Sequence, residues 1–211
     1  MSNAWLVRPS PHGHNRMNGF KSGNFIAIGW PGIGDLTGKT REQIKELLSR
    51  PPYEYESLEL GNAYATVDIF VNQMDIDDLV LVPDNDDIHF CMIKSDYYFD
   101  AKYDSDSAGY SHQREVEWLT STSRNALPMD LRKSLRVHRA TANLSRHYET
   151  IEAIAYGRDL PDDPTSSGED SFVSVEYPLR PDVIATVTIP KDITRIESER
   201  LADFVRTLYF Q

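Results

Sequence analysis

A short apolar strand that leads directly into a tryptophan and a glycine-rich turn constrains this chain more than any other feature. The run from Phe25 to Thr37 reads FIAIGWPGIGDLT, and its first four residues predict a buried strand. Trp30 follows this strand, where proline and glycines supply a turn with few side chains to cover its ring. Such a ring either packs into the core or stacks on a flat ligand, such as a nucleobase extruded from its helix. Trp30 is therefore the first candidate for a binding site.

Strands and helices are predicted in mixed order before residue 157, which favours an α+β domain. Helices are indicated by a Thr-x-x-Gln capping box at Thr40, by apolar residues at helical spacing over 57–72, and by Ser145 before 145–156. Loops are expected over residues 9–19 and 100–109, the second of them mobile. Strands are expected over residues 4–8, 24–30, 78–83, 88–98 and 112–119, with a turn of helix and a short strand between 123 and 141.

A change in composition after residue 157 predicts a second, smaller unit. Residues 158–170 are rich in proline, serine, glycine and aspartate, as in a linker. Beyond them, residues 171–177 and 183–189 read as strands, and a capping box at Thr194 begins a helix. The apolar residues of this helix are expected to point inward: Ile196, Leu201, Phe204, Val205 and Leu208. About forty residues rarely fold alone, so residues 171–211 are expected to dock on the main domain or to form a homodimer.

The net charge of −11 opposes nucleic-acid binding by the chain as a whole, but the charge is unevenly distributed. Residues 71–110 hold ten acidic and two basic residues, whereas residues 111–147 hold seven basic and three acidic ones. The second segment either presents a basic face on an acidic body or pairs its arginines with the chain's own carboxylates. The candidates for phosphate contacts, which would position a nucleic acid without specifying its sequence, are Arg124, Arg132, Lys133, Arg136 and Arg139.

Three motifs resemble catalytic or metal sites but do not meet their requirements. Residues 32–40 resemble a phosphate-binding loop, yet five or three residues precede the Gly-Lys-Thr end where four are needed. Asp84 and Asp100 match a loose nuclease pattern, but a strand of about ten residues would hold them roughly 30 Å apart. His12 and His14 have no further ligand at zinc-site spacing. We therefore expect no catalytic residue, no metal site and no cofactor.

Cysteine usage and hydropathy predict a cytoplasmic protein. Cys91 is the single cysteine and lies in an apolar run, which fits a reducing compartment. No stretch approaches the ~18 apolar residues of a membrane span. The first residues lack the basic-then-apolar pattern of a signal peptide. No membrane contact is expected.

The order of these segments resembles PUA-like domains of the EVE and YTH kind. The segments that carry the resemblance are Leu6–Ser10, Lys21–Trp30, a helix, Ile76–Val82, a strand pair, Arg114–Leu119, and a Leu127–Pro128 segment followed by basic residues. The resemblance covers about residues 4–157, and residues 26–37 are similar to N-terminal modules of bacterial modification-dependent restriction systems. It implies a curved β-barrel flanked by helices over residues 1–157. The linker over residues 158–170 and the strand-strand-helix module over residues 171–211 are expected from their own composition and patterning.

The resemblance also implies a binding site. In such domains a flipped, often methylated base enters an aromatic pocket at the mouth of the barrel, and Trp30 matches the tryptophan that forms one wall. Trp118 matches a tryptophan that serves mainly as packing. The remaining pocket candidates are Gly29 beside the ring, Ser10 and Asn15 at the polar edge, and Tyr97 and Tyr98 on the opposite wall.

We therefore interpret the chain as a non-enzymatic protein that recognises a modified or extruded base, in DNA rather than RNA, in a bacterial or phage defence system. The sequence shows no nuclease or ATPase domain and is acidic, which favours a specificity subunit whose protein partner carries the nuclease or effector activity. Three alternatives stay open. They are a protein-interaction adaptor that uses the acidic loops at 84–87 and 100–106, a reader of modified RNA, and an enzyme acting on a small nucleotide.

Overall fold

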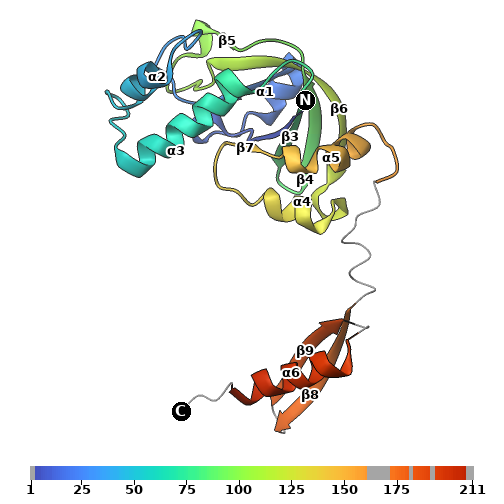
Figure 1. Cartoon of the computed structure of the whole chain (residues 1–211). Helices are drawn as coiled ribbons and strands as arrows, with labels where there is room; N and C mark the ends of the chain where they lie inside the picture. Colours follow the sequence, from blue (N-terminus) through green and yellow to red (C-terminus); the bar gives the residue numbers. More distant parts are fainter. Residues whose placement is uncertain (1–2, 161–171, 181–182, 191–192, 208–211) are drawn as a thin grey trace. The chain divides into compact units, whose positions relative to one another are not determined.

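The computed structural model describes residues 3–160, 172–180, 183–190 and 193–207, in two units that span residues 1–159 and 160–211. The first unit is a mixed α+β domain whose curled sheet is flanked by helices (Figure 1). Its strands are β1 (Ala4–Val7), β2 (Phe25–Ile28), β3 (Leu79–Asp84), β4 (Asp87–Ile93), β5 (Tyr98–Phe99), β6 (His112–Ser123) and β7 (Thr141–Asn143). The expected α+β class and the curved sheet flanked by helices are confirmed.

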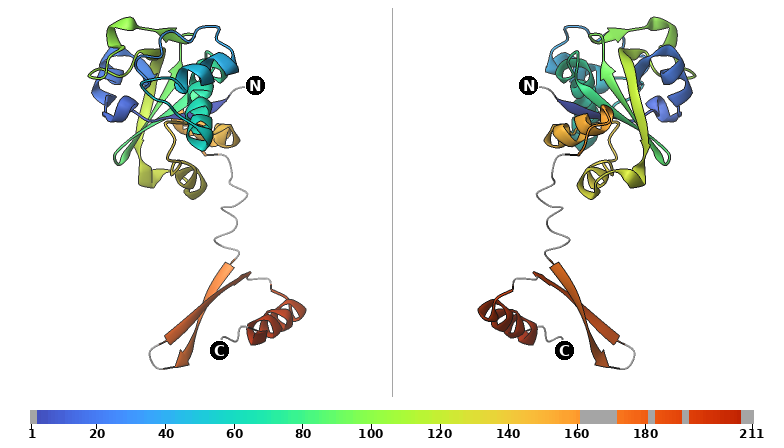
Figure 2. Two further views of the ribbon diagram at one scale, coloured as in Figure 1. Left: turned by 90° about the vertical axis from the view of Figure 1, so that its left-hand side faces the viewer. Right: turned by 90° about the vertical axis from the view of Figure 1, so that its right-hand side faces the viewer.

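The seven strands form one strongly twisted sheet (Figure 2). Their order is β2-β6-β4-β3-β1-β7, and β5 pairs with β6. β1 runs parallel to β3, and the other pairs are antiparallel. The register between β4 and β6 shifts at Phe90 and Cys91, and an irregularity of this kind increases the local twist of a sheet. The long strand β6 pairs with both β2 and β4, so it links the β2 edge to the centre of the curled sheet.

Two apolar cores lie on opposite faces of the central strands. Trp5 and Val7 of β1 belong to one core, whereas Ala4 and Leu6 of the same strand belong to the other. Successive side chains of a strand point to opposite faces, so a strand covered on both sides is apolar at every position. This accounts for the continuous apolar sequence of β1, and β3 alternates between the two cores in the same way.

Helices cover both faces. The first core contains residues of α1 (Met17–Gly23), α2 (Arg41–Leu48) and α3 (Ser57–Asp68), whereas the second contains residues of α4 (Met129–Ser134) and α5 (Tyr148–Ala155). The predicted capping box at the start of α2 is present, because Thr40 N–H donates to Gln43 Oε1 and Gln43 N–H donates to Thr40 Oγ1. Helices α2 and α3 lie side by side (Figure 1).

A buried arginine supports the end of α3, which continues as a π-helical turn over Ile69–Gln73. Arg114 of β6 is only 3% exposed. Its Nε donates to Phe70 O at 2.7 Å and its Nη2 to Val71 O at 3.1 Å, and Nη1 donates to Ser95 O at 3.2 Å. The carbonyl groups of the turn thus keep hydrogen-bond partners inside the protein. Arg114 is one of the basic residues of segment 111–147, but it binds backbone rather than facing solvent.

Three boundaries differ from the sequence-based expectation. Helix α1 lies partly in the predicted 9–19 loop, because packing of Met17 and Phe20 in the core outweighs the low helix propensity of its glycines. The predicted 88–98 strand ends at Ile93, and β5 follows separately. Ser145 does not cap a helix, because its Oγ accepts from Ala4 N–H at 3.2 Å. Helix α5 begins after a 3₁₀ turn, at Tyr148.

The second unit consists of an antiparallel pair, β8 (Phe172–Arg180) and β9 (Val183–Pro190), and helix α6 (Arg195–Thr207). Its predicted capping box is present between Thr194 and Glu197. Of the residues of this helix expected to point inward, Ile196, Phe204 and Val205 are exposed in the structure and Leu201 is partly exposed. Linker residues 161–170 and Leu208 lie outside the described residues. Within the described ranges, no helix has the length and apolar character to cross a membrane.

Candidate functional site

Trp30 lies at the edge of an open hollow of ≈ 610 Å³. Its ring packs against the first core on one side and is partly exposed. The hollow is also lined by Tyr55, by one face of α3 and by the segment before β7. Its lining residues are Trp30, Tyr55, Glu59, Asn62, Ala63, Thr66, Val137, His138, Arg139 and Ala140. This volume falls in the range of about 300–1,000 Å³ that is typical of small-ligand sites.

The lining combines flat rings with a few polar groups. Trp30 and Tyr55 offer aromatic surface, and Glu59 and Asn62 lie one helical turn apart on α3, where side chains share a face. Arg139 Nη2 donates to Asn62 Oδ1 at 2.8 Å. The amide of Asn62 can both donate and accept, and the carboxylate of Glu59 can only accept. The hollow can therefore hold a planar ligand with hydrogen-bonding edges.

Arg8 fixes the wall formed by residues 137–140. Its backbone N–H donates to Ala140 O at 2.8 Å, and its guanidinium donates to the carbonyl oxygens of Leu135, Val137 and Arg139. Burial, with a smaller contribution from Arg124, lowers the pKa of Arg8. One arginine, directly after β1, thus holds a loop wall that has no regular secondary structure.

The backbone of Trp30 is strained. Its φ is 69°, in the left-handed region. For a residue with a Cβ this conformation costs roughly 1–2 kcal/mol and persists only where the surroundings hold it. Three successive residues of the turn are each held by a distant side chain. His112 Nε2 lies 3.3 Å from Trp30 O, Tyr53 OH donates to Pro31 O at 2.9 Å, and Gly32 N–H donates to Asp104 Oδ1 at 2.8 Å.

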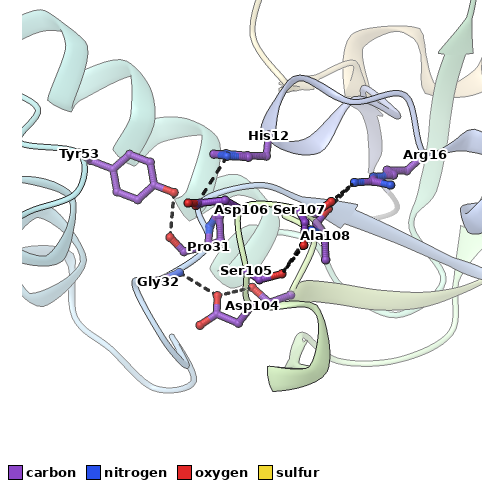
Figure 3. Close-up of polar contacts among 11 residues, drawn as sticks. His12, Arg16, Pro31, Gly32, Tyr53, Asp104, Ser105, Asp106, Ser107 and Ala108 are labelled. Carbon is purple, nitrogen blue, oxygen red and sulfur yellow. Dashed lines mark hydrogen bonds and ion pairs between the residues drawn. The ribbon is translucent and has the colours of Figure 1, made fainter.

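Figure 3 shows two of these contacts, Tyr53 to Pro31 and Gly32 to Asp104, beside the loop over residues 100–109. We expected this loop to be mobile, yet Arg16 Nη2 donates to Ser107 O at 2.6 Å and to Ala108 O at 2.9 Å (Figure 3). Gly109, at the end of the loop, approaches His12 so closely that a Cβ on Gly109 would lie 2.6 Å from His12 Cβ. The loop is therefore tied both to the N-terminal segment and to the Trp30 turn.

His112 is fully buried beneath this turn. Its Nδ1 lies 2.8 Å from Tyr97 OH, and Leu36 N–H donates to the same tyrosine oxygen at 3.2 Å. Burial lowers the pKa of His112 to about 4, so the ring is neutral at pH 7. Burial likewise raises the pKa of Tyr97 above its usual range, which keeps its hydroxyl protonated.

Of the six residues expected to form a pocket, only Trp30 lines the hollow. The other five, which lie elsewhere, are Gly29, Ser10, Asn15, Tyr97 and Tyr98. Gly29 is buried against the backbone of His12, where a Cβ would lie 2.8 Å from His12 N. Ser10 is exposed at the start of a 3₁₀ turn, and Asn15 Nδ2 donates to Asp84 Oδ1 at 2.8 Å. Tyr97 contacts His112, and Tyr98 OH donates to Gln113 Oε1 at 3.0 Å.

The five cations expected to contact phosphate come from one continuous segment, residues 124–139. Arg139 lines the hollow, and Arg124 donates to Asn85 O at 3.3 Å. Lys133 forms an ion pair with Asp130 at 3.4 Å. Arg132 is on α4 and is partly exposed, and Arg136 follows that helix and is exposed. Pairing with the chain's own carboxylates is thus seen for one of the five among the described residues.

The sequence reasoning missed most of the lining of the hollow. Glu59, Asn62 and Thr66 follow one another at spacings of three and four on α3, which places them on a single helical face, and Tyr55 precedes this helix. That spacing was readable in the sequence, but nothing local indicated what the face would meet. Within the part of the chain that the structure describes, no group of three or more His, Cys, Asp or Glu residues could hold a metal.

A comparison with family models matches residues 5–142 to a domain of unknown function, DUF8426. The chain belongs to the DUF8426 family. The DUF8426 region runs from β1 into β7 and contains every residue that lines the hollow, whereas α5 and the second unit lie outside it. A search for similar curated proteins found no match.

Proposed function

We propose that this DUF8426 protein is a non-enzymatic reader of an extruded, modified base, in DNA rather than RNA, on a scaffold of the PUA-like, EVE and YTH kind. The observation that carries the proposal is Trp30, partly exposed at the hollow and held in a strained conformation by side chains of other elements. Strain that persists beside a hollow motivates a functional hypothesis. Stacking on an aromatic ring contributes about 1–3 kcal/mol per base.

Five of the lining residues have a role in the proposed complex. Trp30 stacks on the base, and Tyr55 supplies a second aromatic surface. Asn62 and Glu59 contact the base edge, Asn62 as donor and acceptor and Glu59 as acceptor from an exocyclic amino group. Arg139 contacts phosphate at the rim of the hollow. The cations that precede it in the same segment also contact phosphate; they are Arg124, Arg132, Lys133 and Arg136. A methyl group in a fitted apolar pocket adds roughly 0.8 kcal/mol, so discrimination between modified and unmodified bases is modest.

The charge of the chain supports a role beside a partner. A net charge of −11 opposes the phosphate contacts on which stand-alone affinity depends. We therefore propose a protein partner that carries nuclease or effector activity, in the bacterial or phage defence setting suggested by the resemblance of residues 26–37 to modules of restriction systems. The second unit is the proposed docking or dimerisation element, because Val173, Val175 and Tyr177 are exposed at alternate positions of β8 and so share one face.

Replacing Trp30 by Ala tests this function. Binding is measured by fluorescence anisotropy at about 50 mM salt, because phosphate contacts weaken steeply as salt rises. The probes are DNA duplexes carrying 5-methylcytosine or N6-methyladenine, the unmodified duplex, and RNA of the same sequences. The loss of stacking should weaken binding of the preferred probe roughly 5- to 150-fold.

Leu58→Ala is the matched control, because Leu58 is on α3 and 78% exposed but does not line the hollow. It should bind as the unaltered protein does. Equal binding by Trp30→Ala, or no binding of any probe by the unaltered protein, would contradict the proposal. Preference for the RNA probes would favour a reader of modified RNA.

A protein-interaction adaptor is the second candidate, and the acidic turn at the end of β3 favours it. Asn85, Asp86 and Asp87 are exposed there. An adaptor of this kind binds a basic protein surface through charge complementarity. Trp30→Ala then retains the protein partner, whereas reversal of the charge of Asp86 and Asp87 abolishes its binding.

A further inference from the structure

We propose that His112, oriented by Tyr97, positions Trp30 in its left-handed backbone conformation at the hollow. The three residues lie on different segments: Trp30 follows β2, His112 begins β6, and Tyr97 precedes β5. His112 pairs with Ile28 of β2 in the sheet, two residues before Trp30. The backbone ladder thus ends at Ile28, and the His112 side chain extends the connection between the two strands to Trp30 O. The consequence for ligand binding rests on the proposed function, whereas the positioning itself does not.

The hydrogen-bond directions along this network are consistent at every step. The carbonyl oxygen of Trp30 can only accept, so the hydrogen on the neutral His112 ring lies on Nε2. Nδ1 then carries a lone pair and accepts from Tyr97 OH. The tyrosine oxygen in turn accepts from Leu36 N–H, a group that can only donate. Two backbone groups, the N–H of Leu36 and the carbonyl of Trp30, thus determine the orientation of the tyrosine hydroxyl and the tautomer of the histidine.

Ring packing fixes the plane of the imidazole. The Tyr97 and His112 rings are stacked, with centroids 5.9 Å apart and planes at 20°, and the Phe99 ring is tilted against His112 at 5.5 Å. His112 has 0% exposure, so water does not compete for its nitrogen atoms. A ring held in this way directs one N–H at a single carbonyl group, which is what a positioning residue requires.

Three substitutions separate hydrogen bonding from packing. His112→Phe keeps a ring but removes both nitrogen atoms. His112→Gln keeps an acceptor and a donor at a spacing close to that of the imidazole nitrogens, and it cannot titrate. Tyr97→Phe removes a single hydroxyl group and leaves the ring packing in place, so it keeps the test open if His112→Phe does not fold.

The direct readout is the ¹⁹F resonance of Trp30 in the full chain labelled with 5-fluorotryptophan, without any nucleic acid. Trp30→Phe assigns the signal by its absence. The resonances of Trp5 and Trp118 report whether the rest of the domain remains folded. We expect His112→Phe and Tyr97→Phe to shift or broaden the Trp30 signal alone, and His112→Gln to restore a sharp signal near its original position.

Binding of the preferred oligonucleotide provides the second readout. His112→Phe removes one of the three contacts that hold the turn, so the competent fraction and the affinity should fall by up to roughly five- to thirty-fold. His112→Gln should stay within about twofold of the unaltered protein. A Trp30 resonance that is unchanged in both His112→Phe and Tyr97→Phe overturns the inference, and so does one displaced equally by His112→Gln and His112→Phe. A resonance that moves as expected while the unaltered protein binds no oligonucleotide supports the positioning and refutes the proposed function.

Discussion

Lowering the pH from 7.5 to 5.0 should destabilise the first unit through His112. The buried ring is held neutral, and its pKa falls from 6.5 in the unfolded chain to about 4 in the folded one. A depressed histidine pKa means that the unfolded state binds the proton more readily. The stability that His112 contributes is therefore complete above pH 6.5, and it decreases as the pH falls from about 6.5 towards 4.

The magnitude follows from the two pKa values. Between them, each pH unit changes the free energy of unfolding by about 1.4 kcal/mol. At pH 5.0 the unfolded histidine is almost fully protonated and the folded one almost fully neutral, so the loss relative to pH 7.5 is about 2 kcal/mol. A loss of this size should lower the melting temperature of a domain of about 160 residues by roughly 4–8 °C.

Urea unfolding at both pH values measures this loss in the unaltered protein and in His112→Gln. The difference in unfolding free energy between the two proteins should change by about 2 kcal/mol between pH 7.5 and 5.0, with the unaltered protein losing more. The other histidines, of which only His89 is buried, are present in both proteins, so their contributions cancel. His14→Gln is the control, because His14 is exposed, and it should follow the unaltered protein. Parallel pH profiles for the unaltered protein and His112→Gln would refute the reasoning.

Two further predictions concern the framework of the site, and urea unfolding tests both. Arg114→Met should destabilise the first unit by roughly 3 kcal/mol or more, because three backbone carbonyls lose their buried donor; a change below about 1 kcal/mol would mean that water replaces the guanidinium. Gly109→Ala should cost roughly 1–3 kcal/mol, because its φ is 69° and its Cβ would lie 2.6 Å from His12 Cβ; an unchanged midpoint would show that the 100–109 loop can move away.

Local patterns in the sequence predict much of the fold. The continuous apolar sequence of β3 indicates a strand covered on both faces, and the spacing of Thr40 and Gln43 indicates a helix start. Both signals act over a few residues and do not depend on distant parts of the chain. Helix α1 shows the opposite case, because Gly19 and Gly23 lower its helix propensity and tertiary packing of Met17 and Phe20 stabilises it.

The site was predictable only at Trp30. A strand followed by an aromatic residue and a glycine-rich turn is a local signal, and Trp30 lies two residues after the end of β2, at the hollow. The other walls of the hollow are more than twenty residues away in sequence, and Arg139 is more than one hundred away. Tyr97 shows the same limit. The aromatic residues beside it in the sequence suggest a pocket wall, yet its hydroxyl contacts the buried ring of His112. Such partners follow from the tertiary fold and have no local pattern.

The central claim is that the Trp30 ring stacks on a base in the hollow. Titration of the full chain, labelled with 5-fluorotryptophan, with a duplex carrying a modified base tests it most directly. The account predicts that the Trp30 ¹⁹F resonance shifts in proportion to the bound fraction, while the resonances of Trp5 and Trp118 stay in place. Binding that leaves the Trp30 resonance unmoved would contradict the account.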